Sequence, residues 1–479
     1  MINESILIDF YEFTMAYGYF KEGHHNRFAT FDLFFRAFPD SGGYAVFAGL
    51  ESMMHYIENL RFSDEDIAYF KARSLFDDAF LDYLKNFTFS GDVLAMPEGS
   101  IIFPNEPIVT IKAPIIEAQL LETFLLQVFN HQSLIATKAS RLQYAAGERF
   151  IIEMGARRAH GSTSANLGAR ASYIGGIAAS SNTMADRLYG VPALGTMAHS
   201  WVQSFDQEIE AFYAYARHFP QSATFLVDTY DTLKSGVPNA IKVMQEVLVP
   251  QGINTFAVRI DSGDLAYLSR HTRKLLDQAG LKTCKIVASN ALDEHLIRAL
   301  IDQGAPIDIF GVGERLITAK SDPVFGGVYK LSSIERNGVL EPTLKLSDNP
   351  KKMTNPGFKQ VYRIYNEEGL AQADMVTLED EVIDTTQPLR LFDPTHTWLE
   401  KTFSQYTVKA LLVPIFKAGQ CVYERPDLKA IAQYKKAELA TFWDEMKRFM
   451  YPHQYHVDLS EKLWHTKQAL IQAKRTLKV

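Results

Sequence analysis

Cysteine is nearly absent from this chain of 479 residues, in which only Cys284 and Cys421 occur. Two cysteines exclude a disulfide framework and a cysteine-based zinc site, and they favour a reducing compartment. The N-terminus also lacks the basic segment and the apolar run of a secretory signal. The most apolar stretch, residues 120–134, is interrupted by polar side chains and is too short to span a bilayer. We therefore expect a cytoplasmic protein.

Positive charge is not in excess, because 49 lysines and arginines face 56 acidic residues and leave a net charge of −7. This balance argues against a broad nucleic-acid-binding surface, although a local basic pocket for a phosphorylated small molecule is compatible with it. A Walker A loop, an HExxH motif and the ligand spacing of a cysteine–histidine metal site are missing as well. Hydrophobic residues make up 47% of the chain, which indicates a globular protein rather than a disordered one.

Strand-like and helix-like segments alternate regularly in the middle of the chain. The short apolar runs lie at residues 224–228, 255–260, 284–289 and 307–311, and the helix-like segments between them at 238–249, 265–279 and 293–303. This alternation is typical of parallel βα units. Each apolar run leads into polar residues or glycines, and chemistry in such folds lies beyond the carboxyl ends of the strands. We therefore expect these four strand ends to converge on one site.

The segments on either side of this region have a different pattern. Residues 1–125 mix aromatic-rich helices with strand-like pieces, which predicts an N-terminal α+β domain. Residues 126–345 carry the α/β pattern and the candidate active site. Residues 346–479 begin irregularly and end in charged helices, which predicts a C-terminal subdomain with terminal helices.

A histidine and a group of arginines are candidates for phosphate chemistry. His199 lies among small and hydroxyl residues, as a phosphate-accepting or acid–base histidine would, although a lone histidine is more often structural. Arg157, Arg158 and Arg170 surround a stretch of small residues. They could form an anion-binding wall or an ordinary salt-bridged group.

Glycines, carboxylates and hydroxyls follow the other strands. Gly311 and Gly313 could let backbone N–H groups surround a phosphate, or they could form a plain turn. Asp261 and Asp264 suit ribose hydroxyls or Mg²⁺, or alternatively an Asx turn and a helix cap. The run Ser-Ser-Asn-Thr at 180–183 offers neutral donors for a carboxylate, or a helix cap.

The joint order of these segments resembles the nicotinate phosphoribosyltransferase family. The similarity covers most of the chain and is carried by Gly-Thr-Met-Ala-His-Ser at 195–200, Arg-Ile-Asp-Ser-Gly-Asp at 259–264, Phe-Gly-Val-Gly at 310–313 and shorter pieces at 9–16, 34–36, 288–290 and 328–331. The resemblance implies an irregular, TIM-like α/β barrel with an N-terminal α+β domain and a C-terminal subdomain. It also implies the first step of NAD synthesis from nicotinate, in which nicotinate and phosphoribosyl pyrophosphate form nicotinate mononucleotide, with Mg²⁺ and coupled ATP hydrolysis.

The resemblance further implies the roles of two catalytic residues and one aromatic residue. His199 would be the phosphohistidine formed from ATP, and Asp261 would hold the ribose hydroxyls. Tyr11 would stack on the pyridine ring across the interface of a homodimer.

The remaining implied contacts bind substrate. Thr196 and Arg259 would contact nicotinate, and Arg157 would contact the phosphoribosyl group. The amides of Gly311 and Gly313 would bind the 5′-phosphate.

Two local features refine this expectation. Ser180 and its two neighbours can donate hydrogen bonds and include no carboxylate, so we predict nicotinate rather than nicotinamide as substrate. Glu314 stands directly after Gly313, where relatives often carry threonine. Because a carboxylate repels phosphate, we expect Glu314 to turn away, or to pair with Arg315 or a nearby lysine. Thr318 could replace the missing threonine only if this loop turns helically.

Three alternatives stay open from the sequence. Two are enzymes of the same fold plan, a nicotinamide or a quinolinate phosphoribosyltransferase. The third is a non-catalytic binder of NAD precursors. We expect no nucleic-acid or membrane partner in any of these cases.

Overall fold

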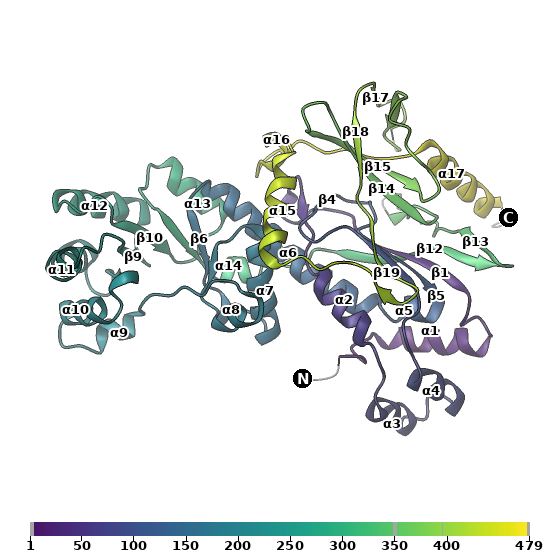
Figure 1. Cartoon of the computed structure of the whole chain (residues 1–479), viewed down its shortest axis with the longest axis horizontal. Coiled ribbons are helices and arrows are strands. Elements are labelled where there is room, and N and C mark those ends of the chain that lie inside the picture. Colours follow the sequence, from purple (N-terminus) through teal and green to yellow (C-terminus); the bar gives the residue numbers. More distant parts are fainter. Residues whose placement is uncertain (1–3, 348–351, 395, 477–479) are drawn as a thin grey trace. The chain divides into compact units, whose positions relative to one another are not determined.

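The computed structural model describes residues 4–347, 352–394 and 396–476 (Figure 1). The contacts within the chain divide it into two units. Unit 1 contains the residues up to Leu134 and those from Val324 onward, and unit 2 contains Ile135–Pro323. The division into domains 1–125, 126–345 and 346–479 stays a prediction.

Unit 2 is built on a parallel sheet. In the described residues its strands are paired in the order β7-β6-β11-β10-β9-β8, and all neighbours are parallel. The strands are β6 (Phe150–Glu153), β7 (Ala179–Ser180), β8 (Thr224–Leu226), β9 (Ala257–Ile260), β10 (Lys285–Ser289) and β11 (Ile309–Val312). The four predicted apolar runs correspond to β8, β9, β10 and β11, so the predicted α/β class is confirmed.

The helices of unit 2 connect these strands. They are α7 (Ser162–Gly175), α8 (Thr183–Tyr189), α9 (His199–Gln203), α10 (Glu208–His218), α11 (Val237–Val243), α12 (Leu265–Gln278), α13 (Glu294–Asp302) and α14 (Glu314–Ile317). Helices α12 and α13 lie within the segments predicted at 265–279 and 293–303, and α11 begins one residue before the segment predicted at 238–249. Side chains at their starts fix where they begin, since Asp264 caps α12 and Asp293 caps α13 through backbone N–H groups of the first turn.

The barrel implied by the resemblance is visible only as this parallel sheet. Within the described part of the chain, no strand pairing joins the outer strands β7 and β8. The interior strands carry fully buried apolar residues such as Val258, Ile286 and Phe310. Near-continuous apolar strands are typical of a parallel sheet covered on both faces.

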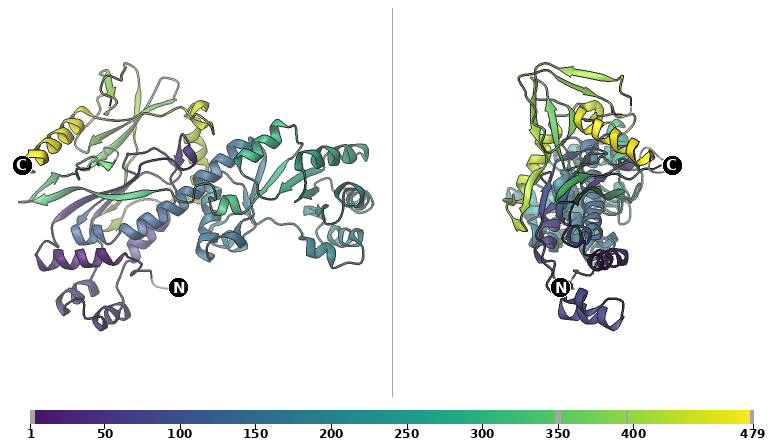
Figure 2. Two further views of the ribbon diagram at one scale, coloured as in Figure 1. Left: turned by 180° about the vertical axis from the view of Figure 1, so that it is seen from behind. Right: turned by 90° about the vertical axis from the view of Figure 1, so that its right-hand side faces the viewer.

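Unit 1 contains a large sheet to which both ends of the chain contribute. Its order among the described residues is β13-β12-β1-β5-β3-β19-β20. The long strands β1 and β12 run antiparallel side by side (Figures 1 and 2). The strands are β1 (Phe28–Phe35), β3 (Asp92–Ala95), β5 (Val109–Pro114), β12 (Gly327–Arg336), β13 (Val339–Pro342), β19 (Val413–Lys417) and β20 (Gln420–Cys421).

Smaller sheets and helices complete unit 1. A second sheet has the order β18-β14-β15-β21, and two strand pairs, β16-β17 and β2-β4, stand apart. These strands are β2 (Ala45–Val46), β4 (Ile101–Ile102), β14 (Lys359–Tyr365), β15 (Ala371–Leu378), β16 (Leu389–Phe392), β17 (Glu400–Phe403), β18 (Thr407–Ala410) and β21 (Val457–Leu459). The helices are α1 (Phe10–Lys21), α2 (Leu50–Asn59), α3 (Asp64–Ala72), α4 (Asp78–Lys85), α5 (Ile115–Gln119), α15 (Leu428–Ala440), α16 (Asp444–Lys447) and α17 (Glu461–Thr476), while α6 (Glu122–Ala146) runs from unit 1 into unit 2.

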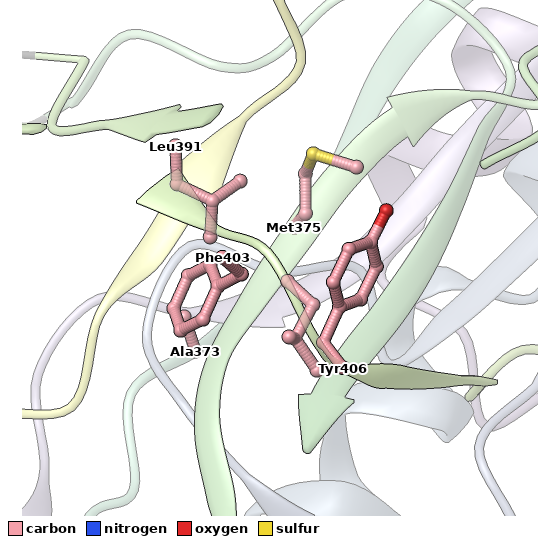
Figure 3. Close-up of a cluster of buried hydrophobic side chains, with 6 residues drawn as sticks. Ala373, Met375, Leu391, Phe403 and Tyr406 are labelled. Atoms are coloured by element: carbon pink, nitrogen blue, oxygen red, sulfur yellow. The ribbon is translucent and has the colours of Figure 1, made fainter. Parts of the chain in front are cut away.

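A cluster of buried side chains holds the second sheet to the β16-β17 pair (Figure 3). Met375 of β15, Leu391 of β16 and Phe403 of β17 meet there with Tyr406. The Tyr406 hydroxyl donates to the carbonyls of Asp384 and Gln387, so its polar end is satisfied although its ring is buried.

Among the described residues, no helix has both the length and the apolar character needed to cross a bilayer.

Candidate active site

The carboxyl ends of the unit 2 strands carry a cluster of polar side chains centred on Arg259 of β9. The guanidinium donates from Nε to Ser289 Oγ at 2.9 Å, from Nη1 to Thr196 Oγ1 at 3.0 Å and from Nη2 to Asp261 Oδ1 at 3.1 Å. Only 15% of this side chain is exposed. One arginine therefore joins the end of β10, the loop before α9 and the turn after β9, as the predicted convergence of strand ends requires.

His199 is the first residue of α9 and lies beside this cluster. Its Nδ1 is 3.1 Å from the hydroxyl oxygen of Thr229, and its Nε2 is 3.8 Å from Asp261 Oδ2. The imidazole is 40% exposed, so a ligand can reach it. The structure thus brings together His199, Asp261, Arg259 and Thr196, four of the residues predicted for the site.

Asp228 lies two residues after β8, at the end of the first of the four apolar runs that were expected to converge, although no role was predicted for it. Its Oδ2 accepts hydrogen bonds from the Asp261 backbone N–H at 2.9 Å and from the Ser262 hydroxyl at 2.5 Å. Its Oδ1 is buried and has no hydrogen-bond partner among the described residues. Asp264 accepts from the Tyr267 backbone N–H at 2.9 Å, so it adopts the helix-cap alternative. The Asp228 carboxylate is therefore held to the turn that carries Asp261.

The two glycines near α14 differ in position. Gly311 lies inside β11 in register with Ser289 and Ile152, whereas Gly313 lies beyond the strand and precedes α14. A Cβ atom on Gly311 would lie 2.7 Å from Met154 Sδ, and one on Gly313 would lie 3.1 Å from the Met154 carbonyl oxygen. The Gly-x-Gly motif thus allows close approach of the residue after β6. Its contact with phosphate stays a prediction.

Glu314 pairs with a lysine, one of the outcomes expected from the sequence. Lys320 Nζ donates to Glu314 Oε1 at 2.8 Å, and this hydrogen bond and charge lower the pKa of Glu314. Arg315 pairs instead with Asp293. The loop does turn helically, but the Thr318 hydroxyl donates to the Glu314 carbonyl at 2.6 Å. That donor is therefore already in use.

Ser180 is fully buried at the end of β7. Its hydroxyl donates to Glu153 Oε2 at 2.5 Å and accepts from the Asn182 backbone N–H at 3.0 Å. The hydroxyl hydrogen is thus engaged by a carboxylate that the sequence analysis did not single out. The predicted contact of Ser180 with nicotinate stays a prediction.

Arg157 and Tyr11 lie outside the hydrogen-bonded cluster. Arg157 is exposed in a short 3-10 helix, Ala156–Arg158, that follows β6. Tyr11 lies on α1 in unit 1 and is 46% exposed. Burial, together with the charges of Glu122 and Glu12, raises the pKa of its phenol. The roles of both residues stay predictions.

The missed residues carry weak sequence signals. Asp228 and Thr229 lie two and three residues after the apolar strand β8, and Glu153 is the last residue of β6. That position marks all three only once the neighbouring strands are known. No group of three or more metal-ligating side chains was found in the described ranges of the chain.

Profiles of one protein family match nearly the whole chain. The nicotinate phosphoribosyltransferase N-terminal domain matches residues 6–130, the nicotinate phosphoribosyltransferase family matches 150–373 and the corresponding C-terminal domain matches 358–467. Nicotinate phosphoribosyltransferase of Bacillus subtilis is 45% identical over 98% of this chain and 95% of the relative. The Homo sapiens enzyme of the same name is 33% identical over 97% of this chain and 96% of the relative.

Solved structures agree with these matches. The crystal structure of human nicotinic acid phosphoribosyltransferase has a TM-score of 0.85 at 31% identity and covers 97% of this chain and 99% of its own. Nicotinate-nucleotide pyrophosphorylase from Pyrococcus furiosus shares the fold, with a TM-score of 0.70 at 22% identity over 92% of this chain and 97% of its own. The chain belongs to the nicotinate phosphoribosyltransferase family.

Proposed function

We propose that this protein joins nicotinate to phosphoribosyl pyrophosphate and releases nicotinate mononucleotide and pyrophosphate. The observation that carries the proposal is the Arg259 cluster, which gathers the family's motif residues at one edge of the unit 2 sheet. A bond forms between the pyridine nitrogen and C1 of the ribose, and the bond from C1 to the pyrophosphate oxygen breaks. The family's reaction supplies the first step of NAD synthesis from nicotinate.

The residue types suit this reaction. The pyridine nitrogen is already a nucleophile, so the site needs no general base. It must instead stabilise a cationic ribosyl centre and a leaving pyrophosphate by fixed charges. Asp261 is held by Arg259 and by the Ser289 hydroxyl, so its carboxylate is preorganised to face the ribose. Thr196 and Arg259 bind nicotinate, and Arg157 binds the phosphoribosyl group.

ATP coupling is assigned to His199. The γ-phosphoryl group of ATP moves to a ring nitrogen of His199 and ADP leaves, and water later cleaves the phosphohistidine to release phosphate. The added charge and acceptor oxygens then reorganise the substrate pocket. The exposed imidazole supports this role, and the Thr229 contact at Nδ1 orients the ring.

The proposal includes Mg²⁺, bound together with the pyrophosphate group. Magnesium is commonly held by one or two carboxylates together with substrate phosphates, which suits the pair Asp228 and Asp261. The Asp228 Oδ1 atom, which has no hydrogen-bond partner in the described part of the chain, fits such a ligand. When bound, the ion neutralises pyrophosphate charge.

The finer structural features implied by the resemblance are part of the same proposal. We infer an irregular barrel built on the unit 2 sheet, and a homodimer in which Tyr11 of one subunit contributes to the active site of its neighbour. Exposed apolar side chains on α1 support the dimer, since Phe10 and Tyr11 are each about half exposed. Both cysteines are free thiols, which supports a reducing compartment such as the cytoplasm.

Substrate choice follows from the run at 180–182. The Asn182 side chain accepts from two backbone N–H groups of α8 and donates to Asn166 Oδ1 at 2.9 Å. The neutral groups Ser181 and Asn182 favour nicotinate over nicotinamide.

The test is formation of mononucleotide from phosphoribosyl pyrophosphate and Mg²⁺ with nicotinate, nicotinamide or quinolinate, each with and without ATP. We expect product from nicotinate, stimulated by ATP.

Acid-labile radiolabel from [γ-³²P]ATP should appear on the wild-type protein and not on H199N. T229V should weaken ATP stimulation and T229S should restore it. Absence of product with all three bases would indicate a non-catalytic binder of NAD precursors. Turnover of nicotinamide equal to that of nicotinate would refute the predicted substrate choice.

A further inference from the structure

Glu153 is a buried carboxylate at the edge of the sheet where the candidate site lies. It is the last residue of β6 and is 1% exposed. Oε1 accepts the Gly155 backbone N–H, and Oε2 accepts the Ser180 hydroxyl at 2.5 Å. Burial raises the pKa of this carboxyl. Each of its two oxygens thus bonds a different segment of the site.

The bond to Gly155 fixes the turn that leads to Arg157. The Gly155 carbonyl accepts from the Arg158 N–H at 2.7 Å, which begins the short helix carrying Arg157. A Cβ on Gly155 would lie 2.7 Å from Ile317 of α14 and 2.8 Å from Glu153 Oε1. The turn is therefore pressed between the carboxylate and the helix that follows Gly313.

The bond to Ser180 fixes the run proposed to bind the pyridine carboxylate. Besides receiving the Ser180 hydroxyl, Glu153 accepts the Ser181 N–H through its backbone carbonyl at 2.8 Å. Ser180 Oγ in turn accepts from the Asn182 N–H. The chain of hydrogen bonds ends at Asn182, whose side chain caps α8.

We propose that Glu153 is a positioning residue that sets the phosphoribosyl-binding turn at 155–157 and the nicotinate-binding run at 180–182 together. It contacts neither substrate and acts through Gly155 and Ser180. The inference rests on the proposed function, because it names which substrate each segment serves. Loss of Glu153 therefore weakens binding of both substrates, whereas loss of the Ser180 hydroxyl weakens binding of nicotinate alone.

If Glu153 had a purely structural role, its loss would lower stability without this pattern of changes in substrate binding. The chain offers a matched control for that case. Glu117 in unit 1 is also buried, accepts a backbone N–H and a hydroxyl from Ser90 at 2.6 and 2.9 Å, and has its pKa raised by burial. E117A removes the same kind of interaction from a place with no proposed substrate contact.

The experiment compares E153A, E153Q, S180A and E117A with the wild type by thermal melt and by separate KM values for nicotinate and phosphoribosyl pyrophosphate. We expect E153A to raise both KM values about tenfold, as a small misplacement of binding groups does. E153Q keeps the size of the side chain and recovers most of the loss. S180A raises only the nicotinate KM, and E117A changes neither KM although it lowers the melting temperature.

Two outcomes overturn the inference. One is a folded E153A with wild-type KM values for both substrates. The other applies if E153A does not fold: it is a wild-type KM for nicotinate in a folded S180A. Absence of product from the wild type would instead overturn the proposed function and this inference with it, so the two failures are distinguishable.

Discussion

Arg259 joins three segments of the site through three nitrogens in one plane. Lysine preserves the charge but concentrates it on a single nitrogen, so it cannot reach Ser289, Thr196 and Asp261 together. We expect R259K to lower kcat/KM by about 100-fold, because misplaced groups cost that much where reacting atoms must be aligned. Steady-state kinetics with nicotinate provides the measurement.

Arg273 supplies the control for this substitution. Like Arg259 it uses three nitrogens, which donate to the carbonyls of Leu281 and Cys284 and to Asp277, but it lies on α12 outside the cluster. R273K should lower the melting temperature and leave kcat/KM near the wild-type value. Equal losses of activity in both variants would show that the R259K effect is general destabilisation.

Site residues could be predicted from the sequence where a motif marks them. His199, Thr196, Arg259 and Asp261 stand within distinctive motifs, and the structure brings them together. Thr229 does not, because a hydroxyl after a strand has no specific spacing. Its contact with His199 spans 30 positions in the chain and appears only after β8 and α9 are placed.

At the scale of elements, local patterns predicted the parallel strands β8, β9, β10 and β11, because each is a short apolar run followed by polar residues or glycines. Which strands pair with one another was harder to predict from the sequence. β1 pairs with β12, which follows it by about 300 positions, and β3 pairs with β19. Antiparallel neighbours from opposite ends of the chain leave no local signal, so the joint sheet of unit 1 could not be inferred.

Helix α1 carries a buried acid that makes the stability of unit 1 depend on pH. Glu12 is fully buried; its Oε1 accepts the Thr123 hydroxyl at 2.5 Å, and its Oε2 has no hydrogen-bond partner within the described ranges. Burial, reinforced by the charges of Glu122 and Asp9 and opposed by the Thr123 hydrogen bond, raises the pKa of Glu12 to about 8. An unfolded glutamate has a pKa near 4.3, so the folded state binds more protons than the unfolded state between these values.

The sign follows from this difference in bound protons. Stability falls as the pH rises from about 5 to about 8, because the unfolded state releases its proton first. We expect Glu12→Gln to remove this fall, a difference on the order of 3 kcal/mol between the two pH values. Denaturant unfolding of both proteins at pH 5 and pH 8 measures it. A constant stability difference between wild type and E12Q at both pH values would contradict the assignment.

At the scale of the whole molecule, the N-terminal and C-terminal parts of unit 1 are joined by a buried ionic network. Arg363 of β14 donates to both oxygens of Asp374 at 2.9 and 2.7 Å, to Glu438 of α15 at 3.0 Å and to the Ile101 carbonyl at 2.8 Å. Tyr455 also donates to Asp374. Residues more than 250 positions apart thus meet at one fully buried guanidinium.

R363M tests how much of the chain depends on that network. Methionine fills part of the volume but leaves the buried carboxylate of Asp374 without its charge partner, which costs about 3–5 kcal/mol. A loss of that size lowers the melting temperature by roughly 5–8 °C in a unit of this size. Differential scanning calorimetry measures the shift. The double variant R363M/D374L, which removes the uncompensated charge as well, should be less destabilised than R363M.

Arg390 is the matched exposed arginine. It pairs with Glu400 and Glu461 on the surface of unit 1, and its side chain is 52% exposed. Water and salt screen such pairs, so R390M should change stability by less than about 1 kcal/mol. If R363M and R390M lowered the melting temperature equally, burial would not be the reason for the cost. A much larger loss of stability in R363M than in R390M would show that the buried interactions of Arg363 stabilise the joining of the N-terminal and C-terminal parts of unit 1.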